Sequence, residues 1–161
     1  MVLLTEGNTR EARRTASRAA QIHETQQTPV WRAFGLWTIG ASHQLDGRLD
    51  LARTAFSDAH ELLAANDHPL RGAMLAHRAS IDALTGRVDD AVVALARARD
   101  IVAGHDEPEA AVDLLGGFVD VTHGDAETAG ARLDRWAMQI ANSMVLRFIE
   151  RALRAAMAEN A

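Results

Sequence analysis

A short phrase recurs along the chain at a nearly constant interval. In its clearest copy, Gly86 is followed by a small residue, Ala91, and then by a larger apolar residue, Leu95. The other copies start at Gly7, Gly47 and Gly124. The intervals between the four glycines are 40, 39 and 38 residues, and each of the three prolines follows one of these glycines by 22 residues. A fixed period of this size is typical of stacked helix pairs.

The composition excludes several kinds of chemistry. The chain of 161 residues contains no cysteine, and all 17 of its basic residues are arginine. Disulfides, thiolate metal sites, a phosphate-loop lysine and a Schiff-base lysine are therefore excluded. The net charge of −5 argues against direct nucleic-acid binding. With 48% apolar residues the chain has ample material for a core, and we expect no cofactor.

Apolar residues at helical spacing, separated by glycine and proline turns, predict an all-α fold. Thr28 precedes Pro29, so we expect a helix there with Thr28 as its cap. No alternating strand pattern is present. The expected helices cover residues 8–27, 29–45, 49–65, 70–85, 88–103, 109–122, 125–141 and 144–159.

We expect one domain, 1–161, made of a partial first repeat, three full repeats and a capping helix. The proposed units are 1–27, 28–66, 67–104, 105–141 and 142–161. The run from Val2 to Leu4 looks like the last turn of a helix whose beginning is missing, so the chain is either a piece of a longer protein or a small protein with a truncated first unit. The apolar side of helix 8–27 should then lack a partner, which predicts a cover by truncated sequence or a homodimer. No signal peptide or membrane span is evident, so we expect a cytoplasmic protein.

The phrase resembles the tetratricopeptide repeat, which places a small residue at the inter-helix turn, then alanine, then a large apolar residue and another small residue. The matching residues are Gly47, Ala52, Phe56 and Ala59, then Gly86, Ala91, Leu95 and Ala98, with Gly40, Ala79 and Gly117 seven before each turn. The units are longer than the usual 34 residues, and the chain has no tyrosine. Such alanine-rich units are similar to the arrays of LuxR-type, maltose-regulator-like bacterial regulators.

The resemblance implies a right-handed α-solenoid of antiparallel helix pairs whose first helices line a concave groove. Carrying the groove positions over by their distance from each turn glycine gives a largely apolar set. It comprises Phe34, Trp37, Ala41, Gln44, Ala73, Ala76, His77, Ser80, Ala83, Ala111, Leu114, Phe118 and Val121. Such a groove suits a protein or peptide partner and a non-catalytic binding module, or alternatively a sensor of an apolar small molecule. The set is equally compatible with core, if the solenoid is tightly wound or a neighbouring segment fills the groove.

A few polar and aromatic residues carry further alternatives. If the first helices stack side by side, His43, His77, Asp82 and Asp120 converge, and such a group would suit a metal or acid–base chemistry. Their spacing matches no metal-binding or catalytic motif, so we expect hydrogen bonds between helices, no metal and no enzyme. The tryptophans at 31, 37 and 136 are expected to pack in the interior, with Trp37 the best of the three for binding.

Overall fold

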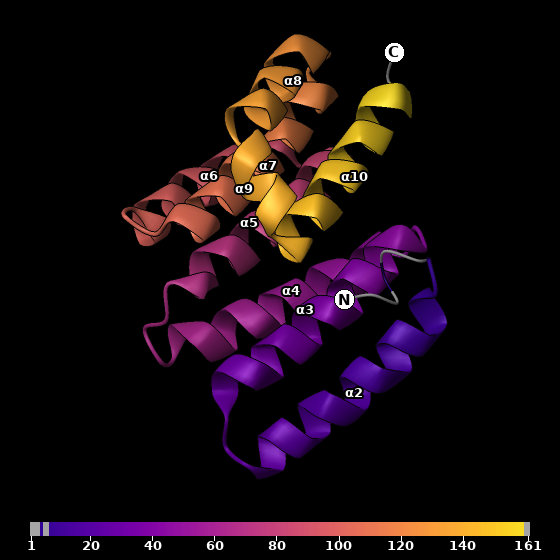
Figure 1. Cartoon of the computed structure of the whole chain (residues 1–161), viewed down its shortest axis with the longest axis vertical. Coiled ribbons are helices and arrows are strands. Elements are labelled where there is room, and N and C mark those ends of the chain that lie inside the picture. The colour runs from indigo at the N-terminus through magenta and orange to yellow at the C-terminus, as the bar shows by residue number, and fades with distance from the viewer. Residues whose placement is uncertain (1–3, 5–6, 160–161) are drawn as a thin grey trace.

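All regular structure in the part of the chain that the computed structural model describes, Leu4 and residues 7–159, is helical. Figure 1 shows the arrangement. The helices are α2 (Thr9–Thr25), α3 (Pro29–Leu45), α4 (Leu49–Ala64), α5 (Leu70–Leu84), α6 (Val88–Val102), α7 (Asp106–Thr122), α8 (Ala126–Arg135), α9 (Ala137–Asn142) and α10 (Met144–Glu159). The expected all-α fold is confirmed. None of the helices within the described residues combines the length and the apolar character needed to cross a bilayer.

The turn glycines adopt the conformation that the repeated phrase requires. The φ angles of Gly47 and Gly86 are +70° and +82°, in the left-handed region that a side chain rarely occupies. The amide of Gly86 donates to the carbonyl of Ala83 at 3.0 Å and so closes the end of α5. Gly7 and Gly124 share the positive φ. The recurring glycine therefore marks helix ends, as its interval predicts.

Two helix boundaries differ from expectation. The segment expected to start at residue 109 begins at Asp106, because Pro108 lies in the first turn, where its missing amide needs no partner. The segment expected over 125–141 divides at Trp136 into α8 and α9. The Trp136 indole Nε1 donates to Asp113 on α7 at 2.9 Å, which holds the ring against α7 at the point of division.

The expectation that Thr28 caps the start of α3 is also wrong. Pro29 occupies the first turn as expected, but Thr28 makes no side-chain cap. Its hydroxyl instead donates to the carbonyl of His23 at 3.3 Å and lies 2.9 Å from His23 Nδ1. The hydroxyl therefore satisfies the end of α2 and not the start of α3.

Consecutive helices pack against each other from α2 to α8. In Figure 1, α2–α4 form the lower part of the molecule and α6–α10 the upper part, with α5 between them. Helix α5 also lies along α7, and α10 packs against α7, α8 and α9. The last helix thus contacts an interior helix of the array as well as its immediate predecessors.

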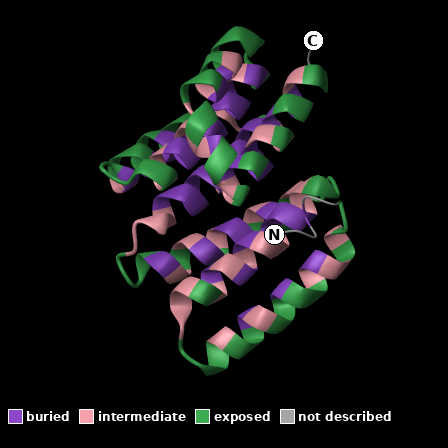
Figure 2. Cartoon of the chain, viewed as in Figure 1, coloured by how far each residue is buried: buried purple, intermediate pink, exposed green. Residues whose placement is uncertain are grey.

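Buried residues follow the inward sides of the helices, as Figure 2 shows, and they include the apolar side of α2. Ala12, Ala16 and Ala20 are all buried, and α2 packs against α3. A Cβ atom added to Gly35 would lie 2.9 Å from Ala20 Cβ, so the two helices approach closely there. The expectation that this side lacks a partner within the chain is wrong, and with it goes the packing argument for a homodimer through α2. The interpretation of Val2 and Leu3 as a helix end lies outside the described residues.

Candidate binding cleft

The residues predicted to line an open groove lie mostly in the interior. Only Phe34 and Gln44 are half-buried, and Trp37 is 1% exposed. The other predicted groove residues are all buried: Ala41, Ala73, Ala76, His77, Ser80, Ala83, Ala111, Leu114, Phe118 and Val121. The structure therefore places most of this set in the core.

Helix α10 explains why so little of the groove is open. Its Phe148 meets Trp37 of α3 edge to face, with ring centroids 5.7 Å apart. Its Val145 joins Phe34, Trp37 and Ala111 around a pocket of only about 50 Å³. This arrangement agrees with the alternative in which a neighbouring segment fills the groove.

Trp37 and His77 form a buried polar pair between α3 and α5. Trp37 Nε1 donates to His77 Nε2 at 2.8 Å, and the His77 ring stacks on Phe56 at a centroid distance of 4.8 Å. Burial lowers the pKa of His77 to about 3, so the ring is neutral near pH 7. Because Nε2 accepts, the neutral ring carries its proton on Nδ1, which has no partner among the described residues. His77 therefore serves this junction and lacks the pKa of a general base.

The four polar residues considered for a shared site each have separate surroundings. Asp82 accepts hydrogen bonds from Arg53 and Arg87. Asp120 accepts from Arg132 at 2.6 Å. Burial, followed by the charges of Arg13 and Arg48, lowers the pKa of His43 at the end of α3. No group of metal-ligating side chains forms within the described residues.

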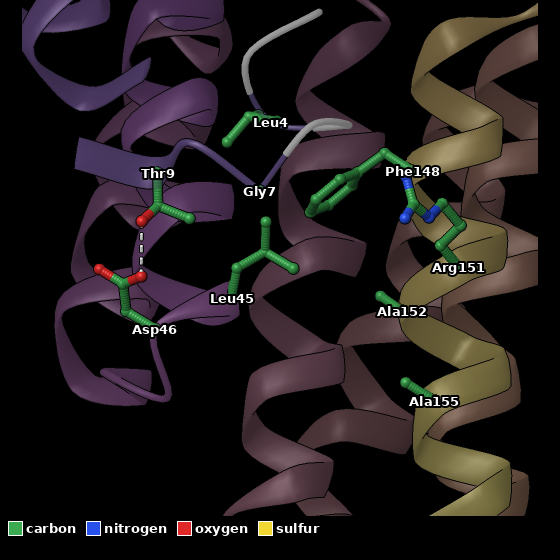
Figure 3. A pocket seen from close by; sticks show the side chains of 9 residues that line it. All are labelled: Leu4, Gly7, Thr9, Leu45, Asp46, Phe148, Arg151, Ala152 and Ala155. Atoms are coloured by element: carbon green, nitrogen blue, oxygen red, sulfur yellow. Dashed lines mark hydrogen bonds between the residues drawn. The ribbon is translucent and has the colours of Figure 1, made fainter. Parts of the chain in front are cut away.

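One open site is a cleft of about 470 Å³ between the N-terminal region, the end of α3 and helix α10, drawn in Figure 3. Leu45 of α3 is 44% exposed and faces this space together with Phe148 of α10. Thr9 Oγ1 donates to Asp46 at 2.7 Å on the α3 side. The other lining residues are Leu4, Gly7, Arg151, Ala152 and Ala155. We define these residues as the Leu45 cleft.

The polar side of the Leu45 cleft carries charges of both signs, those of Asp46 and Arg151, and Asp46 forms an ion pair with Arg13 at 2.5 Å. The hydrogen bond from Thr9 contributes most to lowering the pKa of Asp46; burial opposes the shift, and the hydrogen bond and charge of Arg13 add to it. Asp46 is therefore ionised at neutral pH. The cleft thus combines an apolar wall with the carboxylate of Asp46, which is paired with Arg13, and the guanidinium of Arg151.

Sequence reasoning missed the Leu45 cleft because its two sides come from units far apart in the chain. The expected helix boundaries place Leu45 at a helix end, and Phe148 falls within the expected helix 144–159 with no role of its own. One available signal is the residue two places before each turn glycine, which is the large apolar Leu45 in one unit and the polar Thr122 in another. The prediction for Trp31 is wrong, since its side chain is 61% exposed beside His23.

The structure of the chain itself shows the helix ends at the recurring glycines, the buried Trp37–His77 pair and the Leu45 cleft. Searches of protein-family models, curated proteins and solved structures find no match to the chain.

Proposed function

We propose that the chain is a right-handed, tetratricopeptide-like solenoid that serves as a non-catalytic binding module for a protein or peptide in a bacterial regulatory protein. The Leu45 cleft is the proposed site. The observation that carries the proposal is the exposed apolar surface of Leu45 opposite α10 in a cleft of about 470 Å³. An apolar side chain that enters there loses its contact with water on both sides, which favours binding.

The chemistry of the cleft suggests what the partner segment carries. Phe148 and Leu45 provide apolar surface, and Ala152 and Ala155 leave room for a segment to approach α10. Asp46 and Arg151 supply charges of opposite sign near the same surface. An amphipathic helix with one large apolar residue flanked by polar residues matches both features.

A display library of helical peptides, selected against the full chain, provides the test. Leu45→Glu places a charge in the cleft at an exposed position, so it should weaken the selected peptides by about tenfold or more without unfolding the chain. Leu51→Glu is the matched control, because Leu51 is 50% exposed on α4 and does not line the cleft. Equal affinities of the two variants for every selected peptide would place the site elsewhere.

The volume of the cleft also supports a second function, the sensing of an apolar small molecule. Pockets for such ligands span about 300–1,000 Å³, a range that includes the Leu45 cleft. Ala155→Trp should fill the space, so it should abolish binding of a small apolar dye and displace any copurified ligand detected by mass spectrometry. If the dye binds Ala155→Trp as well as it binds the original chain, the small-molecule function is wrong.

A further inference from the structure

A second cleft, of about 340 Å³, lies among α4, α5 and α6 and is rich in arginine. Arg53 comes from α4, Arg78 from α5 and Arg97 from α6. The remaining lining residues are Leu75, Asp82, Asp90, Val93 and Ala94. We call this site the Arg97 cleft. It shares no lining residue with the Leu45 cleft.

Asp82 fixes two guanidinium groups at the base of the Arg97 cleft. Its Oδ1 accepts from Nε of Arg53 and from Nε of Arg87, both at 2.7 Å, and its side chain is 1% exposed. Burial raises the pKa of Asp82, but the two arginine hydrogen bonds outweigh it, so the pKa stays below its usual value. The carboxylate therefore remains charged and holds both arginines in place.

The arginines retain hydrogen-bonding capacity that the described residues do not use. Arg78 Nε forms an ion pair with Asp82 Oδ2 at 3.8 Å, too far for a hydrogen bond, and is buried without a hydrogen-bond partner among the described residues. Arg87 Nη2 and Asp82 Oδ2 are also buried and unpartnered. Within the described part of the chain, Arg97 makes no hydrogen bond or ion pair. The buried donors Arg78 Nε and Arg87 Nη2 lower the stability of the fold unless an acceptor reaches them.

The charges around the Arg97 cleft are unbalanced. Three guanidinium groups, those of Arg53, Arg78 and Arg97, line the cleft together with two carboxylates, those of Asp82 and Asp90. One positive charge is in excess among the lining residues, although the whole chain carries a net charge of −5. A phosphate group supplies negative charge and several acceptor oxygens for guanidinium groups.

We propose that the Arg97 cleft binds the phosphate group of a small phosphate monoester. The organic part of the ester lies against Leu75 and Val93, which supply apolar surface in the same cleft. The guanidinium groups of Arg78 and Arg97, which both line the cleft, bind the phosphate oxygens. This site goes beyond the function assigned to the Leu45 cleft.

Isothermal titration of the full chain with inorganic phosphate and with phenyl phosphate, at constant ionic strength, tests the proposal. Both should give saturable binding at one site, with phenyl phosphate the tighter because its ring meets Leu75 and Val93. Arg97→Gln should weaken both by about tenfold, the usual effect of losing one charge-assisted hydrogen bond. Arg147→Gln removes the same charge from an exposed position on α10 and should leave both affinities unchanged.

Two results overturn the proposal as a whole, and a third overturns its organic part. One is a non-saturating response to both probes, which indicates ionic strength alone. The other is equal affinity of the Arg97→Gln and Arg147→Gln variants. Tighter binding of inorganic phosphate than of phenyl phosphate rejects the ester and leaves the free ion. Leu45→Glu should retain phosphate binding, so failure of the Leu45 cleft and failure of this site are separable.

Discussion

Helix α5 contacts both α7 and α3, and these two junctions differ in how closely the helices approach each other. Towards α7, the helices lie close together, whereas α3 and α5 meet mainly through side chains. The difference follows from the residue ten places before each turn glycine, which is Trp37 in α3 but Ala76 in α5. A repeated phrase can therefore keep its turns while the spacing of its helices is set by one position per unit.

The α3–α5 junction also contains the buried Trp37–His77 pair. The α5–α7 junction has no such pair, because the residue that corresponds to Trp37 is Ala76. His77 occupies the position beside Ala76 and accepts the indole hydrogen bond of Trp37 from the preceding unit. A large ring that spans a wide junction brings a polar N–H into the core, and that N–H requires an acceptor. His77 thus supplies the acceptor that the buried N–H of Trp37 requires.

The largest expected effect is the loss of the ring that spans the wide junction. Trp37→Ala should lower the free energy of unfolding by about 3–5 kcal/mol, because it leaves a cavity and deprives His77 Nε2 of its donor. Urea unfolding followed by circular dichroism measures it. Trp31→Ala is the control, since that side chain is 61% exposed and its loss should cost about 1 kcal/mol or less. Similar losses for the two variants would remove the distinction between the junctions.

The close junction is tested by adding volume. Ala76→Leu inserts three carbon atoms at a fully buried site and should cost about 1–3 kcal/mol by overpacking. Ala96→Leu makes the same change on an exposed face of α6 and should alter stability by about 0.5 kcal/mol or less. If Ala76→Leu is neutral, α5 and its neighbours are not held at close range by small residues.

The last expected effect depends on pH and belongs to the wide junction alone. The pKa of His77 is about 3 in the folded chain and about 6.5 when unfolded, so the unfolded chain binds the extra proton as the pH falls below 6.5. Stability is therefore complete above pH 6.5, and this group removes about 2 kcal/mol by pH 5.

His77→Gln keeps an acceptor for the Trp37 N–H but does not titrate, so its stability should fall less between pH 7 and 5. Comparing urea unfolding of the two chains at each pH isolates the contribution of His77 from that of His43, which is present in both. Parallel pH profiles for the two chains would show that the His77 ring is not kept neutral by burial.

The sequence predicts the local features of this fold and misses the long-range ones. The glycine interval correctly gives the helix ends, because a left-handed turn depends on one residue. The path of α10 is not predictable in this way, since the Phe148–Trp37 contact joins segments at opposite ends of the repeat register. The apolar character of the groove set can be read directly from the sequence, whereas its burial depends on α10, which lies three proposed units beyond α3.

The repeat pattern also contains a signal for the arginine–aspartate ion pairs between consecutive helices, which we did not predict. Arg13 and Arg53 both lie six residues after a turn glycine, and they pair with Asp46 and Asp82 near the end of the next helix. The earlier hypothesis grouped Asp82 with histidines and not with arginines. Charge partners at matched distances from the turn glycines would have placed Asp82 correctly and drawn attention to the Arg97 cleft.

The contact between Phe148 and Trp37 bears on how the chain folds. In an array of repeats, each unit contacts only its neighbours, so folding can start anywhere and spread step by step. A ring pair that connects α3 with α10 must close a long loop of chain, at an entropic cost that local contacts do not carry. It raises the average sequence separation of native contacts, which slows folding. It also couples the two ends, so the chain should unfold in one cooperative transition and not unit by unit.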